Sequence, residues 1–361
     1  MRFSSFRLLE LVVLLGLGPG CDWVVAGDGL APAPARVPVV YSSDLFHPHQ
    51  DPDDHFDLAC LYAMPEADLR AIILDQGQEQ AKRPGFPAVR QMNHLTGRSV
   101  PAAIGLRDKL VSPEDKDLDQ PAEFQGGVRL LLKTLRESET KVAILFVGSA
   151  RDVVAALNRE PGLFKEKVRC VQGFIGEASD PGNQEWNVSL DPQAYIGLVR
   201  ADIPFHWVPC FDGGLWKNNG HASFWKIKHG QVLAHAPEPL QRFFLYMLRQ
   251  ETNDPIACLS EPLSAKDREW LMGGERNLWC TAFLGLAVGR PVRADGASQD
   301  VAGFERVDVT VDEQAVVRYG KGAGSHSVMR FVIKDRERFA DVATRATADL
   351  LASFPLSVRR P

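Results

Sequence analysis

The sequence has little that would attract nucleic acid. Its 46 aspartate and glutamate residues outnumber its 41 lysine and arginine residues, which gives a net charge of -5 at pH 7 and a pI near 6.0. It has no basic run interleaved with aromatic residues, so we expect no nucleic acid polymer as a partner. At 361 residues, 45% of them hydrophobic, the chain is long enough to bury a large core.

Two common enzyme motifs are also missing. A Ser-His-Asp hydrolase of the α/β type carries a Gly-x-Ser-x-Gly turn, and the nearest stretch, VGSAR at 147–151, has no second glycine in place. A dinucleotide-dependent oxidoreductase needs a Gly-x-Gly-x-x-Gly turn after its first strand, where this chain has SSDLFH. The cysteines show neither a disulfide framework nor the spacing of a metal site, and we expect most of them to act as small apolar residues.

The N-terminus has the features of an export signal. Arg2 and Arg7 precede the apolar run at 8–17, and small residues follow it. We therefore predict that residues 1–35 are a signal peptide with a short linker, and that the protein is periplasmic or extracellular. Cys21 is a weaker candidate for a lipoprotein cleavage site. The alternative interpretation of the whole segment is a buried first helix. With the signal removed, we expect no transmembrane segment.

From residue 36 to residue 361, apolar runs alternate with helical periods. This pattern predicts one α/β domain with an open, mostly parallel Rossmann-like sheet and helices on both faces. Strands are expected at 37–41, 69–74, 142–147, 168–172 and 205–208, with helices at 54–63, 88–96, 124–137, 150–158 and 192–200. Later helices are expected at 239–250, 279–288 and 336–352, with short strands around Val307, Val316 and Phe331.

The stretch SSDLFHPHQDPDDHFDLACLY, 42–62, places five aspartates and three histidines directly after the first predicted strand. Ligands of open α/β sheets bind outside the carboxyl ends of the strands, so this loop is well placed for a site. Hard cations such as Ca²⁺ or Mg²⁺ take several carboxylate and carbonyl oxygens. Alternatively, Asp53 and Asp54 only cap the following helix, and His47, His49 and His55 only face solvent.

A second stretch of interest, CFDGGLWKNNGHASFWKIKHG at 210–230, mixes aromatic rings with a histidine after a strand. One interpretation is a wall that stacks a nucleobase, with His221 as the acid that protonates it. The other is an ordinary surface loop with aromatic packing.

Several motifs together resemble the inosine-uridine nucleoside hydrolases. VVYSSD followed by DDHFDLACLYAMPEADLRAIIL resembles the family's aspartate motif, DxDPGxDDAxAL. ILFVGSARDVVAAL resembles the P-T-G-x-x-T-N segment, and GFIGEASDPGNQEWNVSLDPQAY is similar to the G-G, E-F-N and D-P-E-A segment. The resemblance covers most of 37–352. It implies hydrolysis of the N-glycosidic bond of a ribonucleoside or related ribosyl compound.

The resemblance also implies a divalent cation, with Ca²⁺ expected and a transition metal as the alternative. Asp44, Asp54 and the main-chain carbonyl of Val147 match the family's metal ligands. Asp44 is also the expected base for the attacking water. Together with His221, these residues make up the expected catalytic and metal-binding set. By the same analogy the chain forms a homodimer or homotetramer.

The expected sugar contacts come from three segments. Asp53 matches a ribose contact, and Glu185 and Asn187 match the sugar-binding pair. The remaining positions are less regular: Trp186 replaces the usual Phe, Gln78 takes the place of an Asn, and either Asn183 or Ser179 stands for a further Asn.

The chain departs from the family at two points. Ser42 replaces an Asp in the first motif, and the late His-Asp pair has no counterpart around Leu278 and Trp279. One hypothesis is that His47, His49, Asp51 or Asp57 supplies a replacement ligand; a histidine-rich set would suit a transition metal. The alternatives are different hydrolytic chemistry at the same place, or a non-catalytic sugar- or nucleoside-binding protein with a decayed metal site.

Overall fold

The computed structural model describes residues 35–182, 184–293 and 299–357. The predicted signal peptide therefore lies outside the described residues. No described helix combines the length and the apolar character needed to cross a bilayer.

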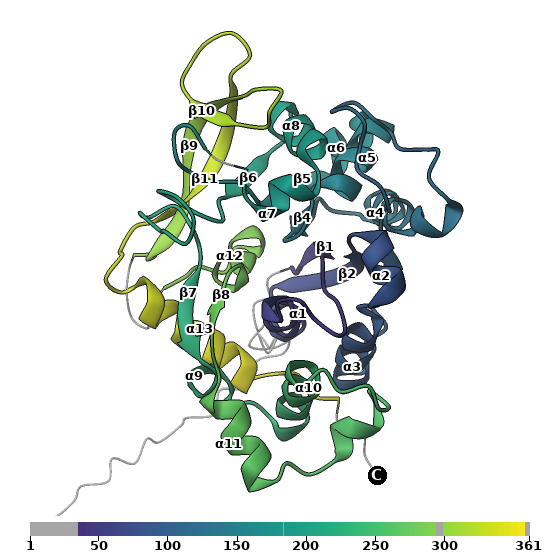
Figure 1. The fold of residues 1–361 in the computed structure, drawn as a ribbon, viewed down its shortest axis with the longest axis vertical. Coiled ribbons are helices and arrows are strands. Elements are labelled where there is room, and N and C mark those ends of the chain that lie inside the picture. Colours follow the sequence, from purple (N-terminus) through teal and green to yellow (C-terminus); the bar gives the residue numbers. More distant parts are fainter. Residues whose placement is uncertain (1–34, 183, 294–298, 358–361) are drawn as a thin grey trace, which may run out of the picture. The chain divides into compact units, whose positions relative to one another are not determined.

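A nine-stranded sheet organises the described chain, in the order β10-β9-β11-β6-β5-β4-β1-β2-β3 (Figure 1). Neighbouring strands from β3 to β11 are parallel, and β9 and β10 add an antiparallel edge. The expected open, mostly parallel sheet is thus confirmed. The strands are β1 Val37–Ser43, β2 Ala67–Leu74, β3 Ala102–Ile104, β4 Val142–Phe146, β5 Val168–Phe174, β6 Phe205–Val208, β9 Ala302–Val311, β10 Val317–Tyr319 and β11 His326–Ile333.

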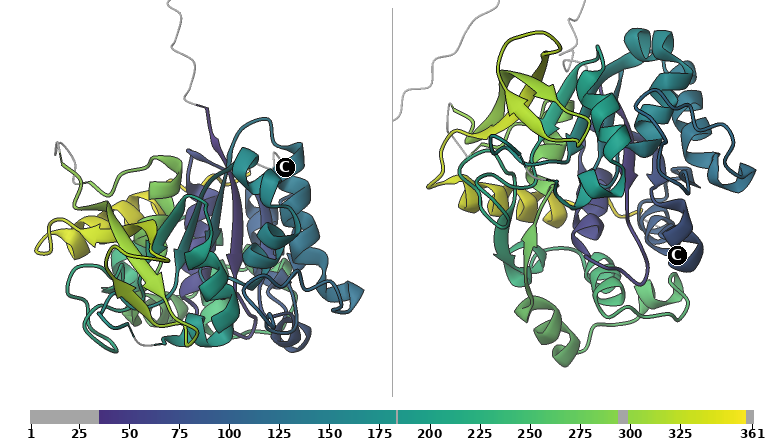
Figure 2. Two further views of the ribbon diagram at one scale, coloured as in Figure 1. Left: turned by 90° about the horizontal axis from the view of Figure 1, so that it is seen from above. Right: turned by 45° about the horizontal axis from the view of Figure 1, so that its top comes forward.

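Helices cover both faces of the sheet (Figure 2). Successive side chains of a strand point to opposite faces. Accordingly, Val39 and Tyr41 join one hydrophobic core, whereas Val40 joins the other. The first core is covered by α1 Asp53–Ala63, α3 Phe86–Thr96, α10 Glu238–Leu248, α12 Thr281–Leu284 and α13 Phe339–Ala352. The second is covered by α4 Gly126–Glu137, α5 Arg151–Arg159, α6 Pro161–Lys167 and α8 Pro192–Arg200.

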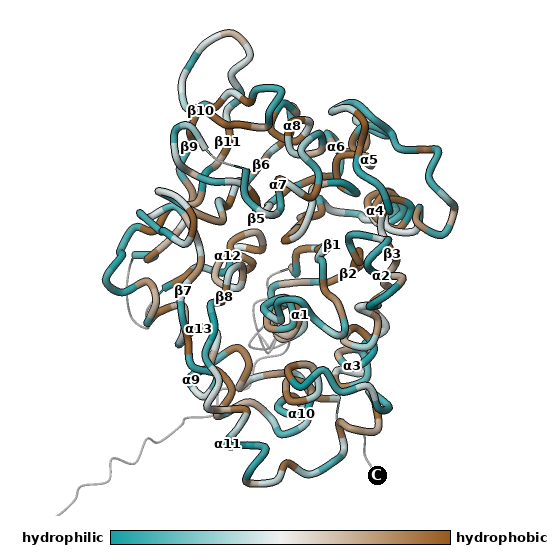
Figure 3. Tube along the Cα trace, viewed as in Figure 1, coloured by the Kyte–Doolittle hydropathy of each residue, from teal (hydrophilic) through white to brown (hydrophobic). Residues whose placement is uncertain are grey.

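The second half of the chain adds short elements that the apolar pattern did not predict. An antiparallel pair, β7 Trp225–Lys228 and β8 Glu275–Leu278, stands apart from the main sheet. The expected helix at 279–288 is shorter and is divided into α12 and η3 Gly285–Val288. Other short helices are α2 Gly77–Lys82, η1 Ala122–Phe124, α7 Trp186–Leu190, α9 His229–Leu233, η2 Ala257–Ser260 and α11 Ala265–Gly273. Apolar residues concentrate in the central strands (Figure 3).

The strand order creates a switch point beside β1. The chain runs from β1 to β2 and β3 on one side, and then returns to β4 on the other side of β1. The connections on either side of β1 and β4 therefore diverge and leave a crevice at the carboxyl ends of the strands. The predicted residues Asp44 and Val147 directly follow β1 and β4, so the fold itself brings them to this crevice.

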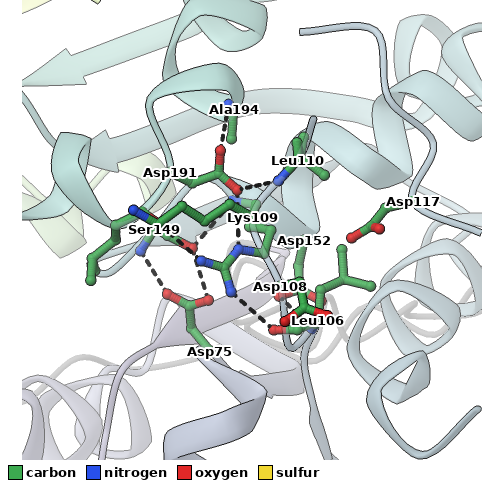
Figure 4. A network of polar contacts seen from close by, with 12 residues as sticks. Asp75, Leu106, Asp108, Lys109, Leu110, Asp117, Ser149, Asp152, Asp191 and Ala194 are labelled. Carbon is green, nitrogen blue, oxygen red and sulfur yellow. Dashed lines mark hydrogen bonds and ion pairs between the residues drawn. The ribbon is translucent and has the colours of Figure 1, made fainter. Parts of the chain in front are cut away.

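A buried polar network fixes the loops behind this edge of the sheet (Figure 4). The Arg151 guanidinium lies 3.1 Å from a carboxylate oxygen of Asp191 and also donates to the main-chain oxygens of Leu106, Arg107 and Leu190. Both members of this ion pair are buried, with side-chain exposures of 5% and 0%. One arginine thus joins α5, the 105–110 loop and the start of α8.

We expect Arg151→Ala to destabilise the fold by about 3 to 5 kcal/mol, because it leaves the Asp191 charge buried without its partner. Urea denaturation measures the loss. Lys133→Ala is the matched control, since Lys133 and Glu137 form an exposed pair at 3.9 Å, and such helix pairs contribute only about 0.3 to 0.5 kcal/mol. Equal losses in the two variants would contradict the role given to the network.

Candidate active site

A cavity of about 480 Å³ opens at the carboxyl ends of the central strands. Its wall combines carboxylates, amides and aromatic rings from segments far apart in the sequence. The lining residues are Asp44, Phe46, Gln50, Asp51, Asp53, Asp54, Val147, Phe174, Glu185, Trp186, Asn187, Cys210, Phe211, Leu215, Trp216 and Trp279. Seven of the predicted site residues are among them: Asp44, Asp53, Asp54, Val147, Glu185, Trp186 and Asn187.

The acidic end of the cavity is built by β1 and the first turn of α1. Asp44 follows β1 and accepts a hydrogen bond of 3.0 Å from the side-chain amide of Gln76. Asp54 accepts one of 2.7 Å from the Ser43 hydroxyl. The N-cap of α1 is Pro52, and no side chain caps this helix. Asp53 and Asp54 therefore do not serve as caps, although their place in the first turn suits the helix dipole.

Burial and mutual repulsion dominate the electrostatics of this end. Burial and then neighbouring Asp75 raise the pKa of Asp44 to about 7. Burial raises the pKa of Asp53 and of Asp54 well above the usual range, and nearby carboxylates add to both shifts. Crowded carboxylates hold protons unless a cation neutralises them. The group therefore has the charge pattern of a cation-binding site.

The Glu185 and Asn187 side chains form the side of the cavity next to the acids. Glu185 is the N-cap of α7, and its carboxylate accepts the main-chain N–H groups of Gly176, Asn187 and Val188 at 2.7 to 2.8 Å. Asn187 donates through its amide nitrogen to the main-chain oxygen of Val147 at 3.1 Å. The E-W-N sequence is thus held rigidly by its own backbone bonds.

The donor atoms fit a divalent cation. Asp44, Asp54 and the carbonyl of Val147 supply the hard oxygens that Ca²⁺ or Mg²⁺ prefers. A carbonyl oxygen has two lone pairs, so the hydrogen bond from Asn187 leaves Val147 able to ligate. The bond also fixes the direction of this carbonyl, as outer-shell partners of metal ligands do.

The cavity wall also includes a cluster of rings, the aromatic end. Trp279 lies 5.4 Å from Trp216 and 5.9 Å from Phe211 between ring centroids, and it also contacts Phe174 and Phe224. Trp216 is 62% exposed and adopts a positive φ of 65°, which is uncommon for a side chain of this size. The same cavity thus presents both exposed indole surface and carboxylates.

Three predicted site residues do not line the cavity. His221 binds Asp212 at 2.8 Å through Nδ1, and its Nε2 lies 2.9 Å from the Arg330 guanidinium. Gln78 is exposed on α2. Ser179 instead donates to Glu177. The structure therefore brings neither His221 nor Gln78 to the carboxylates, and Asn183 lies outside the described residues.

The three histidines of the 44–52 loop and α1 are not solvent-facing. His47 stacks on Tyr246 with centroids 5.0 Å apart, and its Nε2 lies 2.5 Å from the Glu251 main-chain oxygen. His55 is buried next to Phe243 and 6.1 Å from the His49 ring. Burial lowers the pKa of all three. Of the replacement ligands considered, Asp51 lines the cavity and these histidines do not.

Sequence reasoning missed two residues of the site. Gln76, rather than Gln78, brings an amide to Asp44, because its left-handed φ of 59° turns the chain just before Gly77. The sequence DQGQEQ offers a glutamine on each side of that glycine, so the pattern alone did not distinguish them. The sequence drew attention to Trp279 only because the family's His-Asp pair is missing there. In the structure its ring contacts Phe211, Trp216 and Phe224 and is the centre of the aromatic end.

The fold matches solved nucleoside hydrolases. A structure of the inosine-uridine preferring nucleoside hydrolase from Bacillus anthracis aligns over 86% of this chain and 99% of its own, with a TM-score of 0.50 and 17% identity. A plant nucleoside hydrolase aligns over 86% and 99%, with a TM-score of 0.55 and 15% identity. The type III effector XopQ, complexed with adenosine diphosphate ribose, aligns over 89% and 95%, with a TM-score of 0.53 and 14% identity. The described chain thus has the nucleoside hydrolase fold.

The sequence comparison finds ribonucleoside hydrolases as well. Pyrimidine-specific ribonucleoside hydrolases RihA of Citrobacter koseri and Escherichia coli are 28% identical to this chain over 188 residues. The match covers 46% of this chain, which thereby spans 58% of the length of each relative. No family model matches the sequence. The chain is thus similar to ribonucleoside hydrolases in sequence over about half of its length, and to solved nucleoside hydrolases in fold.

Asp75 connects the acidic end of the cavity to the network behind it. It accepts from the main-chain N–H of Ser149 at 2.6 Å and from the Ser149 hydroxyl at 2.8 Å (Figure 4). Burial and then the Asp75 charge raise the pKa of Asp152 to about 8. Within the described part of the chain, Asp152 accepts the main-chain N–H of Leu106 and is not among the residues that line the cavity.

We expect the difference in unfolding free energy between Asp152→Asn and the native protein to shift in favour of Asp152→Asn as pH rises. The native carboxyl, with a folded pKa of about 8, keeps its proton where the unfolded chain, with a pKa of about 3.9, has already lost it. The free energy of unfolding of the native protein therefore falls as pH rises from about 3.9 to about 8. The side-chain amide of Asp152→Asn does not titrate, so that variant does not show this fall. Unfolding free energies at pH 5 and pH 8 test this, and a difference independent of pH would contradict the buried proton.

Proposed function

We propose that this protein is an N-glycosyl hydrolase that cleaves a ribonucleoside or a related ribosyl compound with the help of a divalent cation. The observation that carries the proposal is that one cavity is lined by both a carboxylate group and an aromatic group. Asp44, Asp53 and Asp54 line it together with the rings of Trp216 and Trp279, which lie 5.4 Å apart between centroids. A nucleoside has the same two-part chemistry, with a hydroxyl-rich sugar joined to a flat base.

At the acidic end each side chain has a definite task. Asp44, Asp54 and the Val147 carbonyl hold the cation, and Ca²⁺ is the ion that their hard oxygens suit best. When bound, such a cation supplies Lewis-acid activation of water. Asp44, whose pKa of about 7 is set by burial and Asp75, accepts the proton of the attacking water.

The sugar is held by the carboxylates of Asp53 and Glu185 and by the Asn187 amide. Cleavage of an N-glycosidic bond passes through an oxocarbenium-like sugar, and fixed carboxylates and amide dipoles stabilise the developing positive charge. Glu185 is well suited to this because three main-chain N–H groups fix its position before the substrate arrives. Trp186, 62% exposed beside it, covers the sugar from the solvent side.

The base is held between aromatic rings. Trp216 and Trp279 supply flat faces of the size of a purine or pyrimidine, and stacking tolerates any base. Names of the relatives support nucleosides as the substrate class, since the curated relatives are pyrimidine-specific and the Bacillus anthracis enzyme prefers inosine and uridine. Inosine and uridine are accordingly the first substrates to test.

We expect the native protein to bind Ca²⁺ and to release ribose from inosine or uridine, and Asp54→Ala to lose both by about 100-fold or more, because even outer-shell changes at metal sites cost 10- to 100-fold. Mass spectrometry of metal content and a reducing-sugar assay measure the two effects. Asp341→Asn is the control, because it alters an exposed carboxylate in the first turn of α13.

The outcomes separate the candidate functions. Loss of metal together with loss of ribose release supports the hydrolase. Metal without ribose release from either nucleoside points to different hydrolytic chemistry. Nucleoside binding with neither metal nor turnover overturns the proposal in favour of a non-catalytic binding protein.

We expect Trp216→Ala to raise KM for the accepted nucleoside roughly 5- to 150-fold, because the stacking of one base on an aromatic ring contributes about 1 to 3 kcal/mol. Steady-state kinetics measures this. Trp270→Ala is the matched control, since Trp270 is also exposed but lies on α11 outside the cavity. An unchanged KM in Trp216→Ala would show that the base lies elsewhere.

A further inference from the structure

A second group of potential ligands lies beside the acidic end of the cavity. Asp53, Asp57 and Cys280 bring one ligand atom each within 4.8 Å of one another, and all three residues are buried. Asp53 and Asp57 are four residues apart on α1, so their side chains share one face of the helix. Cys280 is the N-cap residue of α12 and directly follows Trp279 in the sequence.

Asp57 provides an independent indication of a missing ligand. Its residue exposure is 0%, its Oδ1 accepts a hydrogen bond from the Thr281 hydroxyl, and its Oδ2 is buried without a hydrogen-bond partner in the described structure. The Cys280 thiol interacts with this carboxyl but is a weak donor. The oxygen has therefore lost its hydration and gained little in return, which is destabilising. A bound cation would satisfy this oxygen.

We propose that Asp53, Asp57 and Cys280 bind a thiophilic divalent cation such as Zn²⁺, at a position separate from the oxygen ligands Asp44, Asp54 and Val147. The donor set decides the ion, because a thiolate selects Zn²⁺ and similar metals whereas Ca²⁺ takes oxygen alone. Three protein ligands leave a fourth tetrahedral position for water or substrate. On binding, the Cys280 thiol releases its proton to solvent and the sulfur lone pair binds the metal.

The path to this position runs through the cavity. Asp53 lines the cavity wall, so an ion that enters the cavity reaches the group through that carboxylate. A carboxylate has two oxygens, and one ligating oxygen leaves the other for a sugar hydroxyl. The site therefore stands beside the proposed substrate position, but its existence does not depend on turnover.

The first experiment titrates the metal-free full chain with Co²⁺ and follows the thiolate-to-cobalt charge-transfer absorption in the near ultraviolet. The native protein should show this absorption, Zn²⁺ should abolish it by competition, and Cys280→Ser should lack it. Cys258→Ser is the matched control: Cys258 is buried too, but its thiol donates to the Pro255 main-chain oxygen at 3.2 Å, far from the group in sequence. No absorption in the native protein overturns the site without reference to any variant.

Two further variants test the ligand set and its separation from the oxygen site. Asp57→Asn, which can keep the hydrogen bond from Thr281, should weaken Zn²⁺ binding on the order of a hundredfold. Asp54→Ala should keep the cobalt absorption, and Cys280→Ser should keep Ca²⁺ binding. Loss of the cobalt absorption in Asp54→Ala, with thermal unfolding showing that the variant is folded, would overturn the separate position.

This design also separates the site from the hydrolase proposal. Cobalt absorption without ribose release leaves the thiolate site standing and removes the hydrolase. Ribose release without cobalt absorption supports the hydrolase and overturns the thiolate site.

Discussion

Repulsion among buried carboxylates at the carboxyl end of β1 is the constraint on which this structure depends. Asp44, Asp53 and Asp54 are brought together by the switch point between β1 and β4, and burial holds their pKa values up. Such a group is destabilising unless a cation or protons neutralise it. Among the described residues, no arginine pairs with Asp44 or Asp54 as Arg151 pairs with Asp191. Asp191 is neutralised by an arginine and belongs to a structural network. Asp44 and Asp54 are not, which is what a cation-binding site requires.

The surrounding architecture serves to hold this group rigidly. Ser43 and Gln76 each bind one of the carboxylates, and the Glu185 carboxylate is fixed by three main-chain N–H groups. Arg151 holds the neighbouring loop through three main-chain oxygens. These contacts come from four connections of the sheet, so the geometry of the cavity depends on the strand order rather than on a single loop.

The sequence predicted the parts of the site that local pattern determines. Strand and helix periods predicted the parallel sheet, and the spacing of the aspartate motif predicted Asp44, Asp53 and Asp54 at the carboxyl end of β1. Side-chain direction was not predictable in the same way. Gln76 and Gln78 flank one glycine, and only the left-handed turn at Gln76 decides which amide faces Asp44.

His221 illustrates a different limit. It stands in an aromatic stretch after a strand, which is a fair signal for a leaving-group acid, but Asp212 and Arg330 occupy both sides of its ring. Asp212 stands in the same stretch, nine residues before His221, whereas Arg330 comes from β11. No local pattern reveals the contact with Arg330. The short elements α7, β7 and β8 were missed for the same reason, since tertiary pairing rather than periodicity forms them.

The departures from the family pattern are linked rather than scattered. The resemblance calls for a His-Asp pair around Leu278 and Trp279. Here the chain has Trp279, which lines the cavity, followed by Cys280, which is buried in the group with Asp53 and Asp57. Trp279 adds a flat apolar face to the base end, and Cys280 adds a soft donor to the acidic end. Asp57, a buried carboxyl on α1, has an oxygen within 4.8 Å of the Cys280 sulfur. A site that had merely decayed would not be expected to gain a buried carboxylate in contact with the position it had lost, because burying one without a partner is costly. This argument favours the proposed thiolate site over a metal site that has simply been lost.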